Sequence, residues 1–516
     1  MLPPGFTVNR LIQGIQANQN KLRCTPGIKT SDACVFFDSF DWRLYHDDKF
    51  LQTTDSGGLT LQKLGCSETL YRLQQDKTPV WPADVESDGL REYLASVLEM
   101  RALMPMVEVK NQWQYINVVN NDEKTVVRLA IQQSQCFELG TNKIRDLVAR
   151  IHIFGIKGYD KDRTLIEGLL EEQLELSQVC TCLYLEALTA IGRTPGEYSS
   201  KIKVNLQPDE TTGYALRTIF LDLLDTLEVN IDGTKADIDS EFLHDLRVAT
   251  RRTRSALSQV KGVLPEAILD DYKSRFAWVG SVTGPTRDLD VFLLEFDDYR
   301  NSLPNDMGDA LQPLHEYLEE HQKTEQLALK RKLNSPHFRK LLKEWRSYIS
   351  ADPEPADIAP INAYRPVVVV ANERIWKMYK KVLKQGRAIK DDTPAEALHD
   401  LRKSCKKLRY LIEFFQTLYP KKAQKVLVKE LKVLLENLGN FQDLQVQAEK
   451  LHHFAEEMKK ECKAPLDTVM AMGALVADLL RLQQQAREEF AGRFAQFDSE
   501  GNGQSYRALF APEKGK

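Results

Sequence analysis

The stretch His244-Asp-Leu-Arg-Val-Ala-Thr-Arg-Arg-Thr-Arg254 determines the fold prediction, because the chain repeats it as His399-Asp-Leu-Arg-Lys-Ser-Cys-Lys-Lys-Leu-Arg409. A second stretch, Gly284-Pro-Thr-Arg-Asp-Leu-Asp-Val291, recurs as Gly439-Asn-Phe-Gln-Asp-Leu-Gln-Val446 at the same separation of 155 residues. Two motifs in one register, without a gap, indicate an internal duplication. We expect residues 213–350 and 362–510 to form two helical bundles of similar build, related by an approximate two-fold axis.

Both copies of the first motif are predicted to be helices. Asp239-Ser-Glu precedes the first copy, and Thr393-Pro-Ala-Glu396 precedes the second with the order N-cap, Pro, any residue, Glu. At about 100° per residue, the four cationic positions from His244 to Arg254 lie within an arc of about 80°. The second copy repeats this arc, so each helix presents one cationic face.

Cations on one helix face repel each other unless an anion offsets their charge. Arginine forks fit phosphate oxygens and lysines act as point charges, so these mixed faces favour a phosphate ligand. No aromatic residues alternate with the cations, as stacking on single-stranded nucleic acid would require. The candidate ligand-binding residues are His244, Arg247, Arg251, Arg252, Arg254, Arg287, His399, Arg402, Lys403, Lys406, Lys407, Arg409 and Lys432.

Other interpretations stay open. Each cationic face could be an ordinary solvated helix surface, and the two histidines could serve helix packing. The second motif is predicted as a helix that approaches a glycine-bearing turn, where Arg287 either contacts the ligand or pairs with Asp288 or Asp290. His-Asp pairs also occur in metal phosphohydrolases, but no further pair at ligand spacing accompanies them, so we predict no metal site.

The first part of the chain has a different pattern. Residues 33–37, 114–119 and 125–131 are rich in β-branched and aromatic residues and are separated by turn sequences, which predicts an antiparallel sheet. Helical periodicity predicts helices at residues 8–18 and 88–103 and over residues 163–191. Pro and Gly after residue 193 mark a linker. We expect an α+β domain over residues 1–195 and an all-helical domain over residues 206–512.

Charge is distributed unevenly in a chain of net charge −4. Residues 244–264 hold five Arg/Lys and one acid, and residues 399–422 hold seven Arg/Lys and two acids. Positive charge is therefore concentrated at the two repeated helices. No apolar run approaches a membrane span, and the first 20 residues lack the pattern of a signal peptide, so we expect a cytoplasmic protein.

The repeated motifs resemble the CHAD (histidine α-helical domain) family, over roughly residues 213–510. The resemblance implies two four-helix bundles facing each other across a basic central channel. It also implies binding of inorganic polyphosphate, in some members with localisation to polyphosphate granules. On this basis the cations of both repeats are assigned to polyphosphate binding, and no cofactor is expected.

The N-terminal region resembles the CYTH, or triphosphate tunnel, family. The resemblance rests on Leu2-Pro-Pro-Gly, on Phe36-Phe-Asp-Ser-Phe-Asp-Trp-Arg-Leu-Tyr45 and on His152-Ile-Phe-Gly-Ile-Lys-Gly-Tyr-Asp160. It implies a barrel-like antiparallel fold. The family's ExExK strand, which binds a divalent metal and phosphate, does not occur in this sequence, and Phe50-Leu-Gln-Thr53 stands where an arginine pair is expected. We therefore expect a degenerate domain without catalytic residues.

These observations predict a non-catalytic protein that binds inorganic polyphosphate. Two alternatives remain, a metal-dependent triphosphatase of the CYTH type and nucleic-acid binding by the same helices, the latter not favoured. The sequence does not determine the oligomeric state.

Overall fold

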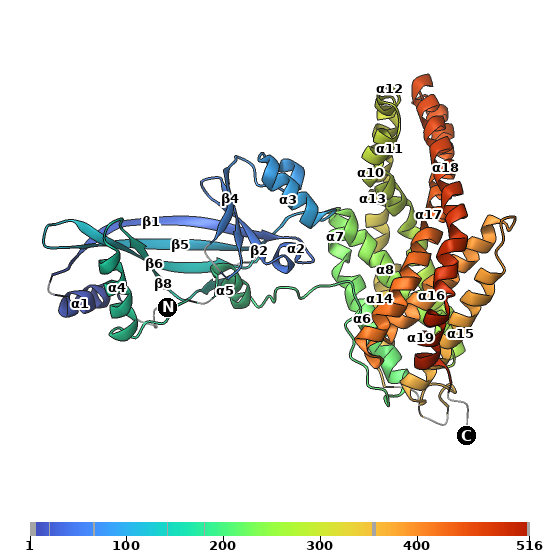
Figure 1. Cartoon of the computed structure of the whole chain (residues 1–516), viewed down its shortest axis with the longest axis horizontal. Coiled ribbons are helices and arrows are strands. Elements are labelled where there is room, and N and C mark those ends of the chain that lie inside the picture. Colours follow the sequence, from blue (N-terminus) through green and yellow to red (C-terminus); the bar gives the residue numbers. More distant parts are fainter. Residues whose placement is uncertain are drawn as a thin grey trace. The chain divides into compact units, whose positions relative to one another are not determined.

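The computed structural model describes residues 7–19, 21–65, 68–141, 143–179, 181–352, 355 and 358–512. It divides into two compact units, Met1–Ser199 and Ser200–Lys516, the first built on a sheet and the second of helices (Figure 1). The Leu2-Pro-Pro-Gly stretch lies outside the described residues. Within them, no helix is both long and apolar enough to span a bilayer.

The first unit is an eight-stranded antiparallel sheet, as predicted. Its centre consists of three long strands, β1 (Arg23–Asp38), β5 (Met104–Val119) and β6 (Thr125–Phe137), which contain the three predicted segments. One side continues through β2 (Lys49–Thr54), β3 (Gly58–Lys63) and β4 (Thr69–Gln74), while β7 (Ile144–Asp146) and β8 (Arg150–Gly155) both pair with β6. The pairings among the described residues do not join β4 to β7 or β8, and barrel-like closure stays a prediction.

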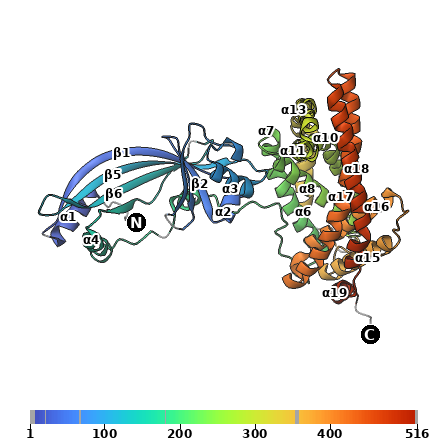
Figure 2. The same cartoon turned by 45° about the horizontal axis from the view of Figure 1, so that its top comes forward.

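Helices pack on this sheet at both ends. At one end α1 (Val8–Asn18) and α4 (Asp160–Glu172) bury Leu11, Ile15 and Leu169 against sheet residues such as Ile116 (Figure 2). Near the other end lie α2 (Arg43–His46), α3 (Asp88–Leu98), α5 (Leu183–Ala190) and the short 3₁₀ turn Pro82–Asp84. The helix predicted over residues 88–103 ends early, because Glu99 has a positive φ of 49° and β5 begins at Met104.

The second unit is helical throughout. Its first repeat contains α6 (Thr212–Val229), α7 (Ile231–Ala236), α8 (Ser240–Gln259), α9 (Glu266–Val282), α10 (Gly284–Leu294), α11 (Phe296–Ser302), α12 (Asn305–Asp309), α13 (Gln312–Leu333) and α14 (Pro336–Ser350). Its second repeat contains α15 (Val367–Arg387), α16 (Ala395–Phe414), the 3₁₀ turn Gln416–Leu418, α17 (Lys421–Lys460), α18 (Leu466–Phe497) and α19 (Glu500–Phe510).

Two hydrophobic cores hold these helices together. The larger core runs through the bundle and includes Phe220, Leu246, Trp345 and Leu408. The smaller core joins two arms, one made of α10 to α13 and the other of the distal parts of α17 and α18, through residues such as Phe292 and Phe454 (Figure 1). Apolar residues at three and four spacing on each helix supply both cores.

The repeated second motif folds differently in its two copies. Thr283, directly before the first copy, separates α9 from α10, because Pro285 lacks the N–H that would continue the helix and its ring crowds the preceding turn. In the second copy Asn440 replaces Pro285, and α17 runs unbroken for 40 residues. The predicted glycine-bearing turn is therefore wrong for the second copy, where Gly439 lies inside α17.

Candidate functional site

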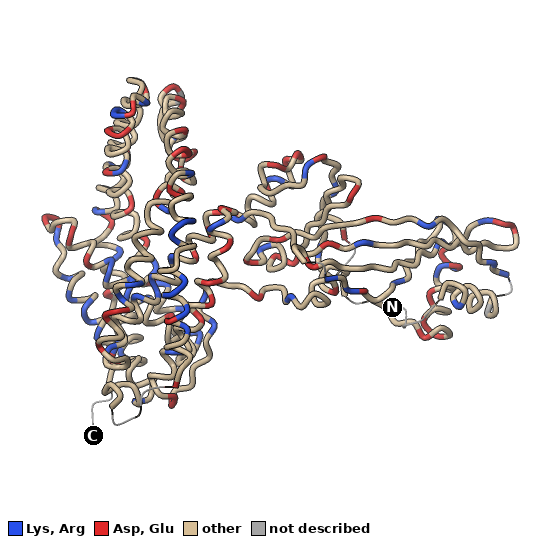
Figure 3. The backbone as a smooth tube through the Cα atoms, turned by 180° about the vertical axis from the view of Figure 1, so that it is seen from behind, with Lys and Arg blue, Asp and Glu red and all other residues tan. Residues whose placement is uncertain are grey.

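The two repeated helices, α8 and α16, pack against each other, and their cationic faces meet at Lys406. Burial lowers the pKa of Lys406 to about 8, and the nearby charges of Arg402 and of Arg251 on α8 add to this shift. Within the described part of the chain, neither Lys406 nor Arg251 forms an ion pair. Like charges from the two repeats thus lie close together in the bundle, where Figure 3 shows Lys and Arg on neighbouring helices.

Arg247, one turn before Arg251, is held by neutral groups. Its Nη1 donates to the Gly280 carbonyl at 3.1 Å and to Thr283 Oγ1 at 2.8 Å, at the interruption between α9 and α10. Burial lowers the pKa of Arg247, and the charge of Arg251 lowers it further. The interruption caused by the proline thus supplies the groups that orient Arg247, without a carboxylate bonded to its guanidinium.

Arg402 is the counterpart of Arg247 in the second repeat, but a carboxylate holds it. Its Nη2 donates to both oxygens of Asp443, at 2.9 and 3.1 Å. A methyl group at Gly439 would lie 3.9 Å from Arg402 Nη2, and one at Gly284 would lie 3.8 Å from Arg247 Nη1. The same two repeated positions therefore lie close together in each copy.

Two of the predicted cations, Arg252 and Arg409, share one carboxylate. Glu413 accepts from Arg252 Nη2 at 3.1 Å and from Arg409 Nε at 2.7 Å. Arg252 Nη1 also donates to the Ser200 carbonyl at 2.6 Å, and its side chain is only 12% exposed. This triad joins α8 to α16, so both arginines have a structural contact in addition to their predicted role.

Arg287 and His399 lie where the helix that carries the second motif packs against the helix that carries the first motif. Arg287 Nη1 donates to the Ser240 carbonyl at 3.2 Å, and its Nη2 lies 3.9 Å from Glu241. Of the two alternatives for Arg287, pairing with Asp288 or Asp290 does not occur among the described residues, where these carboxylates bond to the side chains of Lys450 and Gln322. His399 Nδ1 lies 2.7 Å from the side-chain oxygen of Gln442, the residue equivalent to Arg287, and His244 is partly buried on α8.

The remaining predicted residues differ in their surroundings. Lys403 pairs with Asp400 at 2.6 Å, and Lys432 pairs with Glu436 at 3.4 Å on an exposed part of α17. Arg254 is exposed on α8. Burial lowers the pKa of Lys407, and Lys381 and Lys403 lower it further. Sequence reasoning missed Lys381, although its spacing from Lys377 and Lys384 on α15 follows the helical repeat.

Five predicted cations thus carry no ion pair to a carboxylate within the residues that the structure describes. We call them the uncompensated cations: Arg247, Arg251, Arg254, Lys406 and Lys407. Arg247, Lys406 and Lys407 are partly buried and gain more from an anion than they would in water, whereas Arg251 and Arg254 are exposed. The arrangement can therefore hold a ligand with several negative charges. The described residues contain no group of three or more His, Cys, Asp or Glu side chains placed to hold a metal ion.

Comparison with known proteins identifies the helical unit. Residues 218–452 match the CHAD domain family, so this part of the chain carries a CHAD domain, as the motifs predicted. Solved structures similar to this chain include the CHAD domain from the plant Ricinus communis, with 24% sequence identity and a TM-score of 0.47 over 61% of this chain and 98% of that one. Another is PptA from Streptomyces chartreusis, with 16% identity and a TM-score of 0.42 over 55% and 99% of the two chains. No curated protein matches this chain.

Proposed function

We propose that the CHAD domain of this chain binds inorganic polyphosphate, without chemistry, at the junction of α8 and α16. The observation that carries the proposal is the approach of Lys406 to Arg251, two cations from different repeats that lack an ion pair within the described residues. Such a juxtaposition is unfavourable in the free protein, and a chain of phosphates would relieve it. The resemblance of the sequence to CHAD proteins supports the same ligand class.

A linear polyphosphate suits these cations better than a single phosphate group. The uncompensated cations lie on α8 and α16, and those on α8 span about two helical turns, which is about 10 Å. One phosphate can contact only neighbouring cations, whereas a polymer can contact all of them. In the cell, we expect such a protein in the cytoplasm and at polyphosphate granules. Its N-terminal unit is expected to be a degenerate CYTH-like domain.

The test is retention on immobilised polyphosphate by a variant carrying Arg251→Glu and Lys406→Glu. Its matched control carries Lys323→Glu and Lys343→Glu, two exposed lysines of α13 and α14 that make the same change in net charge. We expect the first variant to lose retention and the control to keep it, with equal helical circular dichroism. Equal retention by both variants would refute the proposed site.

Salt dependence provides a second readout. If about five cations contact phosphates, the logarithm of the affinity should fall with the logarithm of salt concentration with a slope of about −3 to −4. Competition by RNA at matched phosphate concentration tests the nucleic-acid alternative, and preference for RNA would reverse the choice of ligand. Release of phosphate from tripolyphosphate with Mg²⁺ tests the triphosphatase alternative.

A further inference from the structure

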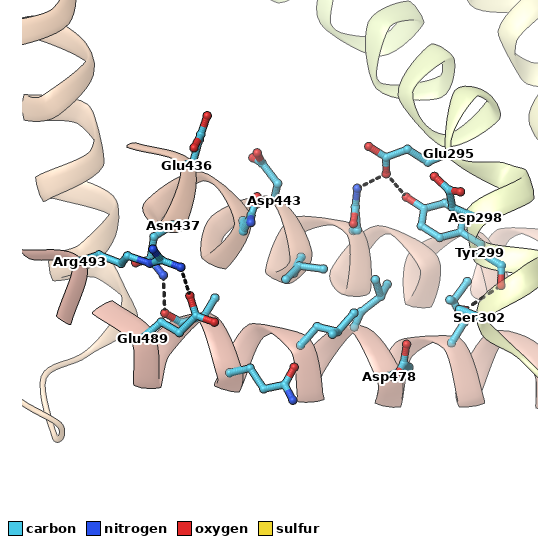
Figure 4. A pocket seen from close by; sticks show the side chains of 18 of the residues that line it. Glu295, Asp298, Tyr299, Ser302, Glu436, Asn437, Asp443, Asp478, Glu489 and Arg493 are labelled. Atoms are coloured by element: carbon cyan, nitrogen blue, oxygen red, sulfur yellow. Dashed lines mark hydrogen bonds and ion pairs between the residues drawn. The ribbon is translucent and has the colours of Figure 1, made fainter. Parts of the chain in front are cut away.

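The helical unit contains a second hollow, of opposite charge to the cationic helices. It is a cleft of about 830 Å³ between α11, with the preceding residue Glu295, on one side and α17 and α18 on the other. Six carboxylates and one guanidinium line it, and Figure 4 shows them on three walls: Glu295, Asp298, Glu436, Asp443, Asp478, Glu489 and Arg493. The cleft is therefore acidic, within a domain whose proposed ligand is an anion.

The surface between these carboxylates is apolar. Val433 and Leu444 from α17 and Leu475, Leu479 and Leu482 from α18 line the same cleft. A ligand with only polar atoms would leave these side chains without favourable contacts. A chain that alternates methylene groups with charged groups would cover them and still reach the carboxylates.

Three carboxylates of the cleft, Asp298, Glu436 and Glu489, are weakly engaged, whereas the other three, Glu295, Asp443 and Asp478, accept from neighbouring side chains. Glu489 pairs with Arg493 at 3.1 Å, and Glu436 pairs with Lys432 at 3.4 Å, both one turn apart on exposed helix surfaces. Pairs of this kind contribute little and exchange partners readily. Within the described residues Asp298 makes no ion pair. A cation that enters the cleft thus meets carboxylates that are available to it.

Asn437 is an independent sign of a ligand. Its side chain lines the cleft but is only 6% exposed, and its Nδ2 donates to the Ala486 carbonyl at 2.8 Å. Its Oδ1 is buried without a hydrogen-bond donor among the described residues. A buried amide oxygen without a donor is unfavourable. A donor bound in the cleft would satisfy it after a small movement of the side chain.

The spacing of the acids distinguishes an extended cation from a metal ion. Glu436 and Asp443 are seven residues apart on α17, about 10 Å, and Asp478 and Glu489 are eleven residues apart on α18, about 16 Å. A Ca²⁺ or Mg²⁺ ion needs its oxygen ligands within about 2.6 Å of one point. Consistent with this, the described residues hold no metal-binding group of three or more such side chains.

We propose that this cleft binds a linear aliphatic polyamine, with its ammonium groups on the dispersed carboxylates and its methylene groups on the leucines. Its ammonium groups are hydrogen-bond donors, and one of them would satisfy the buried oxygen of Asn437. This site is separate from the proposed phosphate site, although the two border each other at Asp443, which lines the cleft and bonds to Arg402.

The test measures binding of spermine to the full chain by calorimetry, at low and at physiological salt. A variant with Asp298→Asn, Glu436→Gln and Glu489→Gln removes three cleft charges and retains side-chain shape. Its matched control carries Asp352→Asn, Asp391→Asn and Asp392→Asn, three exposed loop carboxylates. We expect the cleft variant to bind spermine about tenfold more weakly and the control to bind as the wild type does.

Two further measurements make the result specific. The cleft variant should retain polyphosphate binding, and the Arg251→Glu, Lys406→Glu variant should retain spermine binding, so that failure of one site is distinguishable from failure of the other. Mg²⁺ and a tetralysine peptide serve as competing probes. Equal spermine affinity of the cleft and control variants, or tighter binding of Mg²⁺ or tetralysine than of spermine, would overturn the proposal.

Discussion

If the CHAD domain binds polyphosphate as proposed, the lowered pKa of Lys406 predicts that binding weakens as the pH rises above neutrality. In the free protein this pKa is about 8, well below the ordinary value of 10.5, because of burial and of Arg402 and Arg251. Bound phosphates would favour the charged form and restore the ordinary value. A group whose pKa is lower in the free protein than in the complex takes up a proton on binding. Affinity is therefore highest below about pH 8 and decreases as the pH rises from 8 toward 10.5.

The size of this effect follows from the two pKa values. At a pH of about 9.5, about 3% of Lys406 is charged in the free protein but about 90% in the complex, so affinity should fall about 30-fold relative to pH 7. This corresponds to about 2 kcal/mol. Long-chain polyphosphate is the suitable probe, because its few terminal groups contribute little to its own titration.

The assay is fluorescence anisotropy of labelled polyphosphate at constant ionic strength, from about pH 7 to about pH 9.5. Lys406→Arg is the control, because a guanidinium stays charged throughout this range. We expect affinity to fall steeply for the wild type and to change little for Lys406→Arg. Parallel pH profiles for the two proteins would falsify the assignment of Lys406 to the site.

Two other residues give separate predictions. Glu413→Gln should lower the free energy of unfolding by about 2 to 3 kcal/mol, because Arg252 and Arg409 lose their shared carboxylate. Urea unfolding measures this free energy. A change within experimental error would contradict the structural role of the triad. Asp443→Asn should tighten polyphosphate binding about threefold, since the carboxylate competes with phosphate for Arg402. Fluorescence anisotropy measures this affinity. Weaker binding by the variant would show that Asp443 instead orients Arg402.

The sequence predicted the elements of the site better than their contacts. Helical spacing identified α8 and α16, and Asp239 caps α8 as predicted, accepting from the backbone N–H groups of Glu241 and Phe242. The cap of α16 lies one residue later than predicted, at Pro394, because Thr393 Oγ1 instead accepts from the backbone N–H of Lys390. Local patterns set such elements, and small changes in the chain's path shift their ends.

Contacts between distant segments were not predictable in the same way. Periodicity shows which residues share one helix face, but not which carboxylate of another helix meets it. Glu413 is visible in the sequence as a neighbour of Arg409 at i,i+4, whereas its bond to Arg252 requires the packing of α8 on α16. Asp443 similarly reaches Arg402 only because α17 lies beside α16.

The unbroken course of α17 has a mechanical consequence. Its 40 residues form a rod about 60 Å long, which begins in the bundle and ends in the core shared by the two arms. Gln442 and Asp443, which bond to His399 and Arg402, lie near its midpoint. An unbroken helix transmits a tilt along its whole length. A displacement of the arm would therefore move Gln442 and Asp443, which position His399 and Arg402.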